Sequence, residues 1–324
     1  MKYLVTGGAG YIGSHICDRL LERGHEVVAI DNMSTGQERF LENASKNKNF
    51  VFANRDITQH ANILDLWMQN VDCVYHFAAN ADIRKGFQDH SKDFSQNAVG
   101  TLNVLTAMKK SGVRKIVFAS TAAIYGEPNI FPTPENCPLP NQTSLYGATK
   151  LAAEGLISAF CEGYGFEGYA FRFVTVLGPR YPHGFAFDFV RKLLDDPARL
   201  EVLGNGMAQK SSLHVNDCVD ALMHICEDKQ TAKTSDKKFQ VYNIGTENWY
   251  YVKDAAQWVC DAMGLKPRLE FGSTIRGWPG DNPFIFLDCK KAIDTGWYPR
   301  YNAKTAVYET VEWLNNNKWI FEKR

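Results

Sequence analysis

The first fourteen residues, MKYLVTGGAGYIGS, constrain the fold more than any other stretch of this 324-residue sequence. A short apolar run is followed by glycines at Gly7, Gly8, Gly10 and Gly13, and then by an amphipathic segment over residues 12–21. This order predicts a strand, a tight turn and a helix. A turn without side chains lets a pyrophosphate approach the backbone and the unpaired N–H groups of a helix N-terminus. The stretch therefore predicts a dinucleotide-binding loop.

The end of the next predicted strand indicates which dinucleotide binds. Residues 26–30, EVVAI, are typical of a buried parallel strand, and Asp31 follows them about twenty positions after the glycines. A carboxylate at this point suits the hydroxyls of an adenosine ribose and would repel a 2′-phosphate. The neighbouring Asn32 adds no cation that could accept such a phosphate. The sequence therefore predicts NAD as the cofactor, rather than NADP.

Strand and helix patterns alternate through the first half of the chain. This rhythm predicts an α/β fold with a doubly wound parallel-sheet Rossmann NAD domain. The further strands are expected at 50–53, 72–79, 115–119 and 169–174, and the helices at 61–68, at 91–110 and from Ser144. Residues 32–47 and the proline-rich segment 128–140 are predicted to be loops.

The alternation of strands and helices ends at Gly178, which indicates a smaller mixed α/β substrate domain. We expect the NAD domain to comprise residues 1–174 plus about 213–245, and the substrate domain to comprise about 175–212 plus 246–324. The patterns behind this division are helices at 187–194, 215–227, 252–263 and 304–315 and strands at 200–203 and 240–244.

Composition excludes several classes of partner. Lys plus Arg and Asp plus Glu both number 36, so no global charge favours nucleic acid or a membrane surface. No apolar run approaches the length that spans a membrane. The eight cysteines form no C-x-x-C pair, and the chain begins with a strand pattern rather than a targeting segment. We therefore expect a cytoplasmic protein with reduced cysteines and, since no His or Cys pair has ligand spacing, no metal.

Three residues form a candidate catalytic group. Tyr146 and Lys150 are four positions apart on a predicted helix, so their side chains share one face. A nearby ammonium group favours the phenolate and lowers the pKa of a tyrosine, which is otherwise a poor base at neutral pH. Thr121 follows the fifth predicted strand, at the edge where ligands bind in open α/β sheets. These three side chains predict proton transfer to and from a substrate hydroxyl.

Together these motifs resemble an extended short-chain dehydrogenase/reductase, and most closely the nucleotide-sugar epimerases of the UDP-glucose 4-epimerase type. The resemblance rests on TGGAGYIGSH, Asp56-Ile57, HFAA, the segment 120–126, YGATK and GPR. It implies that Tyr146 is the acid/base, that Lys150 binds the nicotinamide ribose and that Thr121 assists. The expected NAD contacts are Gly7, Gly10, Tyr11, Ile12, Gly13, Asp31, Asn32, Asp56, Ile57, Phe77, Ala78, Ala79, Asn97 and Lys150.

The residues after Thr121 separate subclasses of this family. Sugar 4,6-dehydratases carry an Asp-Glu pair there, whereas this chain has Ala122 and Ala123, which cannot exchange a proton. The best interpretation is a nucleotide-sugar 4-epimerase: hydride leaves sugar C4, the 4-keto intermediate rotates, and hydride returns to its other face. The alternatives are a nucleotide-sugar reductase or dehydrogenase, or another UDP- or dTDP-sugar epimerase of the superfamily.

The second half departs from the family where it should bind a nucleoside diphosphate. The G-x-G-x-x-x-R pattern ends here in Lys210, which keeps the charge without the bidentate fork. The family's R-P-G-D motif reads Trp278-Pro-Gly-Asp281, so Arg276 is the expected substitute cation. Asp281 is expected to bind a ribose hydroxyl.

Thr175, in FVTVLGPR, resembles the subgroup that acts on UDP-glucuronate, where a hydroxyl helps to hold the sugar carboxylate. Arg84 or Arg180 could supply the adjacent cation, but that subgroup's own arginine is replaced by Pro182. UDP-glucose/galactose and UDP-glucuronate/galacturonate therefore rank nearly equal, ahead of N-acetylated sugars. The resemblance also implies a homodimer through helices 91–110 and 144–163. The expected substrate contacts are Arg84, Thr121, Ala122, Tyr146, Thr175, Arg180, Lys210, Arg276 and Asp281.

Overall fold

The computed structural model describes residues 1–84, 86–139, 141–227 and 238–322. The chain divides into two compact units and crosses between them repeatedly. The first unit comprises Met1–Ile124, Ser144–Arg172 and Val219–Tyr242, and the second comprises Tyr125–Thr143, Phe173–Cys218 and Asn243–Arg324. The assignment of NAD binding to one predicted domain and of substrate binding to the other stays a prediction.

Seven strands form the central sheet of the first unit, in the order β11-β6-β5-β4-β1-β2-β3. Strands β1 to β5 run parallel, and Thr6 at the end of β1 lies between Ile30 of β2 and His76 of β4. Because the strand order reverses at β1, a crevice is expected beyond the carboxyl ends of β1 and β4. The strands are β1 Lys2–Thr6, β2 Glu26–Asp31, β3 Phe50–Asn54, β4 Cys73–His76, β5 Lys115–Thr121, β6 Glu167–Phe173 and β11 Phe239–Ile244.

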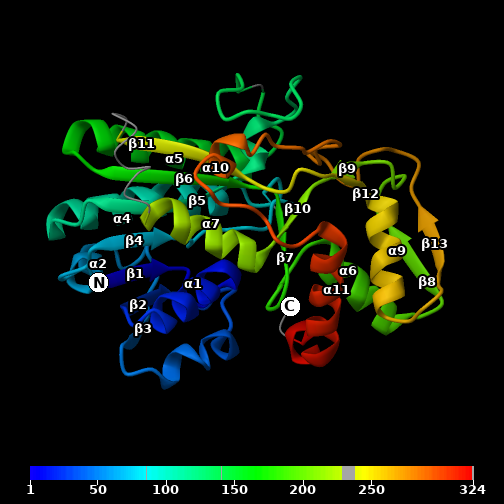
Figure 1. Ribbon diagram of the computed structural model, residues 1–324, viewed down its shortest axis with the longest axis horizontal. Coiled ribbons are helices and arrows are strands. Elements are labelled where there is room, and N and C mark those ends of the chain that lie inside the picture. The colour runs from blue at the N-terminus through cyan, green and yellow to red at the C-terminus, as the bar shows by residue number, and fades with distance from the viewer. Residues whose placement is uncertain (85, 140, 228–237, 323–324) are drawn as a thin grey trace. The chain divides into compact units, whose positions relative to one another are not determined.

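Helices cover both faces of this sheet, as expected of a doubly wound fold (Figure 1). Helices α2, α4 and α5 pack on one face, while α1 and α7 are joined by an ion pair between Arg19 and Asp220. The helices are α1 Tyr11–Glu22, α2 Leu64–Trp67, α3 His90–Asp93, α4 Gly100–Ser111, α5 Leu145–Tyr164 and α7 Val215–Glu227. The helix expected over 91–110 forms as α3, a π-helical stretch Phe94–Val99 and α4, and the segment 32–47 contains 3-10 turns that its polar sequence did not predict.

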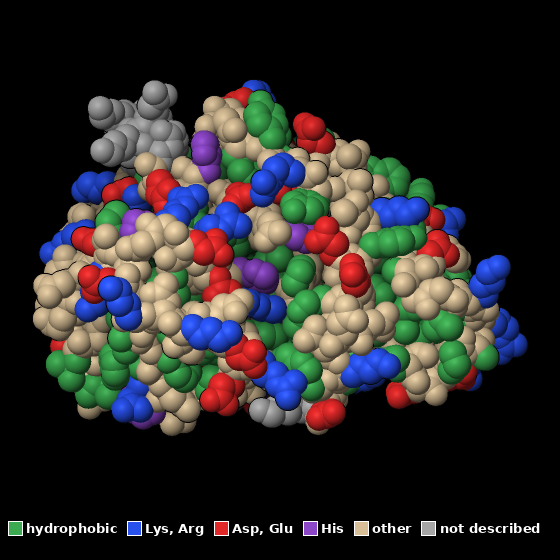
Figure 2. Space-filling model, turned by 60° about the horizontal axis from the view of Figure 1, so that its bottom comes forward, with side chains coloured by type: hydrophobic (Ala, Val, Ile, Leu, Met, Phe, Trp, Pro, Cys, Tyr) green, Lys and Arg blue, Asp and Glu red, His purple; other side chains and the backbone are tan. Residues whose placement is uncertain are grey.

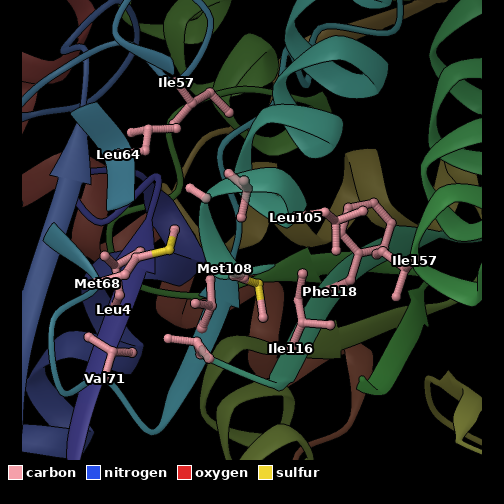
Figure 3. Packing of buried hydrophobic residues seen from close by; sticks show 14 of the residues in the cluster. Leu4, Ile57, Leu64, Met68, Val71, Leu105, Met108, Ile116, Phe118 and Ile157 are labelled. Atoms are coloured by element: carbon pink, nitrogen blue, oxygen red, sulfur yellow. The ribbon is translucent and has the colours of Figure 1, made fainter. Parts of the chain in front are cut away.

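The hydrophobic core of the first unit lies between the sheet and helices α2, α4 and α5 (Figure 3). Leu4 of β1, Met108 of α4, Phe118 of β5 and Ile157 of α5 all belong to this cluster, and all four side chains are buried. Such strands are apolar on both faces because helices cover the sheet on both sides. This packing fixes the strand ends on which the candidate site is built.

The second unit is mixed α/β and contains no large sheet among its described residues. Three strand pairs, β7 with β10, β9 with β12 and β8 with β13, accompany the helices. Their bounds are β7 Thr175–Leu177, β8 Arg199–Val202, β9 Gln209–Lys210, β10 Ser212–His214, β12 Tyr250–Tyr251 and β13 Arg268–Phe271, and those of the helices are α6 Phe185–Asp195, α9 Val252–Ala262, α10 Lys290–Ile293 and α11 Ala303–Asn316. The predicted fold class is confirmed.

Charged side chains of both signs are interspersed over the face drawn in Figure 2. Within the described ranges, none of the helices combines the length and the apolar character needed to cross a bilayer. In the same part of the chain, no three His, Cys, Asp or Glu side chains gather in a way that could hold a metal ion. Pro140, at the end of the predicted proline-rich loop, lies outside the described residues.

Candidate active site

The glycine loop runs from β1 to α1 and closes against the end of β4. Gly7 has φ +69°, and a Cβ there would lie 2.6 Å from the backbone nitrogen of Ala78. A Cβ on Gly13 would lie 2.1 Å from the carbonyl oxygen of Gly7. The backbone itself therefore requires glycine at both positions. The helix N-cap, Gly10, contributes no side-chain hydrogen bond, so no side chain caps the first N–H groups of α1.

Asp31 ends β2 beside this loop. Its carboxylate is 8% exposed and accepts hydrogen bonds from the backbone N–H groups of Ala9, at 3.1 Å, and Met33, at 2.8 Å. Burial raises the pKa of this carboxyl group, whereas the two N–H donors lower it. The two bonds orient the carboxylate and leave it lone pairs for a ribose diol. A side-chain-free loop, an uncapped helix start and an oriented carboxylate are the features that the adenosine diphosphate half of NAD requires, so these residues fit the cofactor.

The end of β4 contributes Phe77, Ala78 and Ala79, which are all partly exposed. Asn97, in contrast, is 1% exposed and links elements rather than facing outward. Its Oδ1 accepts from the backbone N–H of Asn80 at 2.8 Å, and its Nδ2 donates to Thr149 Oγ1 at 3.1 Å. It thereby ties the end of β4 to helix α5.

Two of the expected NAD contacts, Asp56 and Ile57, differ in their surroundings. Asp56 is partly exposed and accepts a hydrogen bond from Asn32 Nδ2 at 2.7 Å, which connects two expected cofactor residues. Ile57 is 3% exposed, and its side chain belongs to the hydrophobic core. Tyr11 and Ile12 lie in the first turn of α1, where both are partly exposed.

Thr121 and Tyr146 meet although 25 positions separate them. Thr121 is the last residue of β5, and Tyr146 lies in the first turn of α5, which begins after the N-cap Ser144. The two side chains are hydrogen bonded, and this bond lowers the pKa of the phenol. Burial is the larger effect and raises that pKa to about 12, and the carboxylate of Asp93 raises it too. Without an added positive charge, Tyr146 therefore stays protonated at neutral pH.

Lys150 is buried one turn further along α5, at 2% exposure. Its Nζ donates to the carbonyl oxygen of Ala119 at 2.7 Å and lies 4.5 Å from the centre of the Phe118 ring. Burial lowers the pKa of Lys150 to about 7, and Glu154 opposes this shift. The structure thus brings the three predicted catalytic residues together on β5 and α5. Near neutrality the charge of Lys150 depends on small changes in its surroundings.

The second unit brings together the three residues predicted to hold the nucleoside diphosphate. Lys210 Nζ lies 2.9 Å from Asp281 Oδ1, and Arg276 Nη1 donates to the backbone carbonyl of Asp281 at 2.7 Å. Asp281 is 5% exposed and also accepts from the N–H of Gly277 at 2.9 Å. Arg276 forms a 2.6 Å ion pair with Glu127, a partner that no motif indicates because the two residues are far apart in the chain.

The remaining predicted substrate residues divide between the units. In the first unit, Ala122 is buried and Arg84 is exposed, with an ion pair of 3.9 Å to Asp82. In the second unit, Thr175 begins β7 opposite Ser212 of β10 and is partly exposed. Arg180 follows shortly after β7 with φ +67°, a left-handed conformation that is uncommon outside glycine.

Comparison with known proteins identifies relatives along almost the whole chain. A putative UDP-glucose 4-epimerase of Methanocaldococcus jannaschii is 32% identical over 321 residues, covering 97% of this chain and 98% of the relative. A crystal structure of a UDP-galactose 4-epimerase has a TM-score of 0.86 at 35% identity, covering 98% of this chain and all of the other. A UDP-glucuronic acid 4-epimerase from Bacillus cereus, in complex with UDP-glucuronic acid and NAD, has a TM-score of 0.86 at 26% identity, covering 98% and 99%.

The names of these relatives match the activity that the sequence predicted. The model of the NAD-dependent epimerase/dehydratase family matches residues 3–245, which include both the glycine loop and the Thr121–Tyr146–Lys150 group. The predicted cofactor, NAD, is confirmed by the family, as is the predicted kind of protein, an enzyme. The chain belongs to the NAD-dependent epimerase/dehydratase family.

Proposed function

We propose that this protein is an NAD-dependent UDP-sugar 4-epimerase. The observation that carries the proposal is the group formed by Thr121, Tyr146 and Lys150 at the end of β5 and the start of α5. A tyrosine hydrogen bonded to a hydroxyl, with a buried lysine one turn away, is suited to moving a proton on and off an alcohol oxygen. The relatives' names support a 4-epimerase among the reactions of this family.

Each of the three side chains has a distinct role in the proposed reaction. Tyr146 takes the proton of the C4 hydroxyl and returns it to the C4 oxygen of the product. Thr121 hydrogen bonds the reacting oxygens and orients them toward the phenol. Lys150, when protonated, stabilises the phenolate, because the surroundings of Tyr146 otherwise raise the pKa of its phenol to about 12. When bound, NAD would supply the acceptor for the C4 hydride and the donor that returns it to the other face of the keto sugar.

Dehydration is disfavoured by the residues that follow Thr121. Loss of water from C5 and C6 requires a base and an acid beside those carbons, and Ala122 and Ala123 have neither. Ala122 is also buried at 4% exposure, so its methyl group belongs to the packing of the site. The residues after Thr121 therefore favour a reaction confined to C4.

We assign the nucleotide to cations of the second unit. Lys210 and Arg276 supply positive charge for the diphosphate, and Asp281 holds both through its side chain and backbone. Because Asp281 already accepts from Lys210 and Gly277, its role includes positioning Lys210 in addition to the expected bond to a ribose hydroxyl. UDP is the proposed nucleotide because the solved relatives bind UDP-sugars.

UDP-glucose and UDP-galactose are the first substrate pair that we propose, and UDP-glucuronate and UDP-galacturonate are the second. The second pair is favoured by Thr175, whose hydroxyl lies at the start of β7. Arg180 in the second unit or Arg84 in the first could pair with the carboxylate. The arginine that the uronate subgroup carries is replaced by Pro182, which places this pair second.

The decisive experiment supplies each UDP-sugar to the purified protein without added cofactor. We expect interconversion of one C4 pair, release of NAD on denaturation, and loss of turnover in Tyr146→Phe. An exposed tyrosine, Tyr298→Phe, is the matched control and should keep full activity. Net formation of NADH would instead indicate a dehydrogenase. Absence of interconversion across UDP- and dTDP-sugars would contradict the proposal.

A cytoplasmic homodimer is part of the proposal. Two large apolar side chains on the helical run over 91–110, Phe94 and Leu102, are 60% and 39% exposed. Large apolar side chains that are this exposed on one helical run are typical of an interaction surface. We expect light scattering to give the mass of a dimer and Phe94→Glu with Leu102→Glu to give a monomer. A monomeric wild-type protein at assay concentration would contradict this assembly.

A further inference from the structure

A buried ion pair between Glu154 and Arg172 belongs to the same unit as Lys150. Glu154 lies one turn beyond Lys150 on α5 and is 4% exposed, and Arg172 of β6 is 5% exposed. Arg172 Nε donates to Glu154 Oε1 at 3.0 Å, and Arg172 Nη2 donates to Oε2 at 2.7 Å. Ser120, next to Thr121 on β5, donates its hydroxyl to Oε1 at 2.5 Å. The carboxylate is thus fixed from two strands.

Such a pair is costly to bury and needs a reason beyond stability. Replacing a buried ion pair by apolar side chains is often neutral or stabilising, whereas removing one partner leaves an uncompensated charge. With Glu154 ionised, the three charges of Lys150, Glu154 and Arg172 sum to one positive charge, which a Tyr146 phenolate would balance. Without Glu154, the guanidinium of Arg172 would be buried without its carboxylate, and Lys150 would lose the acidic group that raises its pKa.

We propose that Glu154, fixed by Arg172 and Ser120, is a positioning residue that keeps Lys150 protonated and its Nζ on the carbonyl of Ala119. This role rests on the proposed function, because a protonated lysine matters most when Tyr146 must become a phenolate. Burial already brings the pKa of Lys150 down to about 7, and Glu154 is the group that opposes this fall. A further fall would leave Lys150 neutral at the pH at which the enzyme works.

The other groups around this pair do not supply the same charge. His76 of β4 faces Lys150, but burial holds its pKa at about 3, so it is neutral and bonded to Thr6 and Thr101. Asp93 lies near Tyr146 and raises the pKa of the phenol, so it acts against the phenolate. On the described elements around Lys150, Glu154 is the acidic group that raises its pKa.

The test titrates Lys150 directly in the NAD-containing protein as purified. Lysine labelled with carbon-13 at Cε reports each side-chain pKa by NMR, and Lys150→Met assigns the signal. In Glu154→Gln, which keeps the size of the side chain but not its charge, we expect the pKa of Lys150 to fall by about one unit or more. The alkaline limb of the kcat profile should move to lower pH by a similar amount. Glu154→Asp, which keeps the charge, should restore most of the limb.

Two further variants separate this role from simple stabilisation. Glu162→Gln removes an exposed carboxylate from the same helix and should leave both the titration and the profile unchanged. Glu154→Gln with Arg172→Met removes both buried charges; it should recover wild-type thermal stability but keep the low pKa of Lys150. This double variant replaces Glu154→Gln in the titration if Glu154→Gln fails to fold. A wild-type pKa of Lys150 in either variant would overturn the proposal. Since the titration needs no turnover, it stays decisive even if no UDP-sugar is epimerised.

Discussion

Gly13→Ala is a sharp test of the glycine loop because the contact it creates is defined by the backbone. Gly13 lies in the first turn of α1, where alanine would ordinarily stabilise a helix by about 1 kcal/mol. Here its Cβ would lie 2.1 Å from the carbonyl oxygen of Gly7. That oxygen accepts from the N–H of Gly10 at 3.0 Å, and the N–H of Gly7 donates to Ile30 at 2.7 Å, so the loop is held at both sides. The loop must move by about 1 Å, which is typical of overpacking that costs about 1–3 kcal/mol.

The expected result is loss of cofactor together with a modest loss of stability. The same movement displaces the N–H groups expected to face the pyrophosphate, so we expect the affinity for NAD to fall at least about tenfold, or by about 1.4 kcal/mol, and the protein to lose bound NAD on purification. The assay is the NAD released per protein chain on denaturation, with thermal unfolding measured alongside. Gly155→Ala, on the exposed side of α5 with no atom within 4 Å of the new Cβ, is the matched control and should keep NAD with an unchanged or raised Tm. Wild-type NAD content and Tm in Gly13→Ala would refute the reasoning.

Three further outcomes follow from the site. Tyr146→Phe should lower kcat by about 10²–10⁴-fold while NAD content is unchanged; a loss of NAD instead would indicate a structural role. Because burial lowers the pKa of Lys150 to about 7, the folded protein binds fewer protons than the unfolded chain from about pH 7 to 10, and stability rises with pH there. Lys150→Met should remove that rise in stability and most of the activity. Thermal unfolding at pH 7 and 9 measures the rise, and the same increase in Tm in Lys150→Met would contradict the assignment to Lys150. Arg276→Ala should raise KM for the UDP-sugar about tenfold with less effect on kcat, whereas Glu127→Gln should leave KM unchanged or lower it; equal effects would contradict the assignment.

The parts of the site that depend on local spacing could be predicted from the sequence. The glycine loop is encoded within fourteen residues, and Asp31 follows at the end of the next strand. Tyr146 and Lys150 share a face because a helix repeats every 3.6 residues. In each case the geometry follows from one element or one strand–turn–helix unit, so no tertiary information was needed.

The partners of those residues could not be predicted, because they come from elements far apart in the chain. Arg172 pairs with Glu154 across 18 positions, and Glu127 pairs with Arg276 across a much longer stretch. None of these charged residues belongs to a recognisable motif, and their separations along the chain match no helix or strand repeat. The burial of Ile57 in the hydrophobic core could not be predicted either, and its contact with NAD stays a prediction.

The charges of the second unit explain why Arg276 is the better candidate for phosphate recognition. Lys210 and Asp281 are both largely buried, at 16% and 6% side-chain exposure, so separating them would leave an unpaired carboxylate in a poorly solvated position. The ion pair of Arg276 with Glu127 is 39% and 44% exposed, and such pairs contribute little because water solvates both partners. A diphosphate can therefore displace Glu127 at small cost and gain a bidentate partner, which a lysine cannot offer. Lys210 therefore contributes its charge to the diphosphate while it stays paired with Asp281, and the bidentate contact that the family arginine would make comes from Arg276.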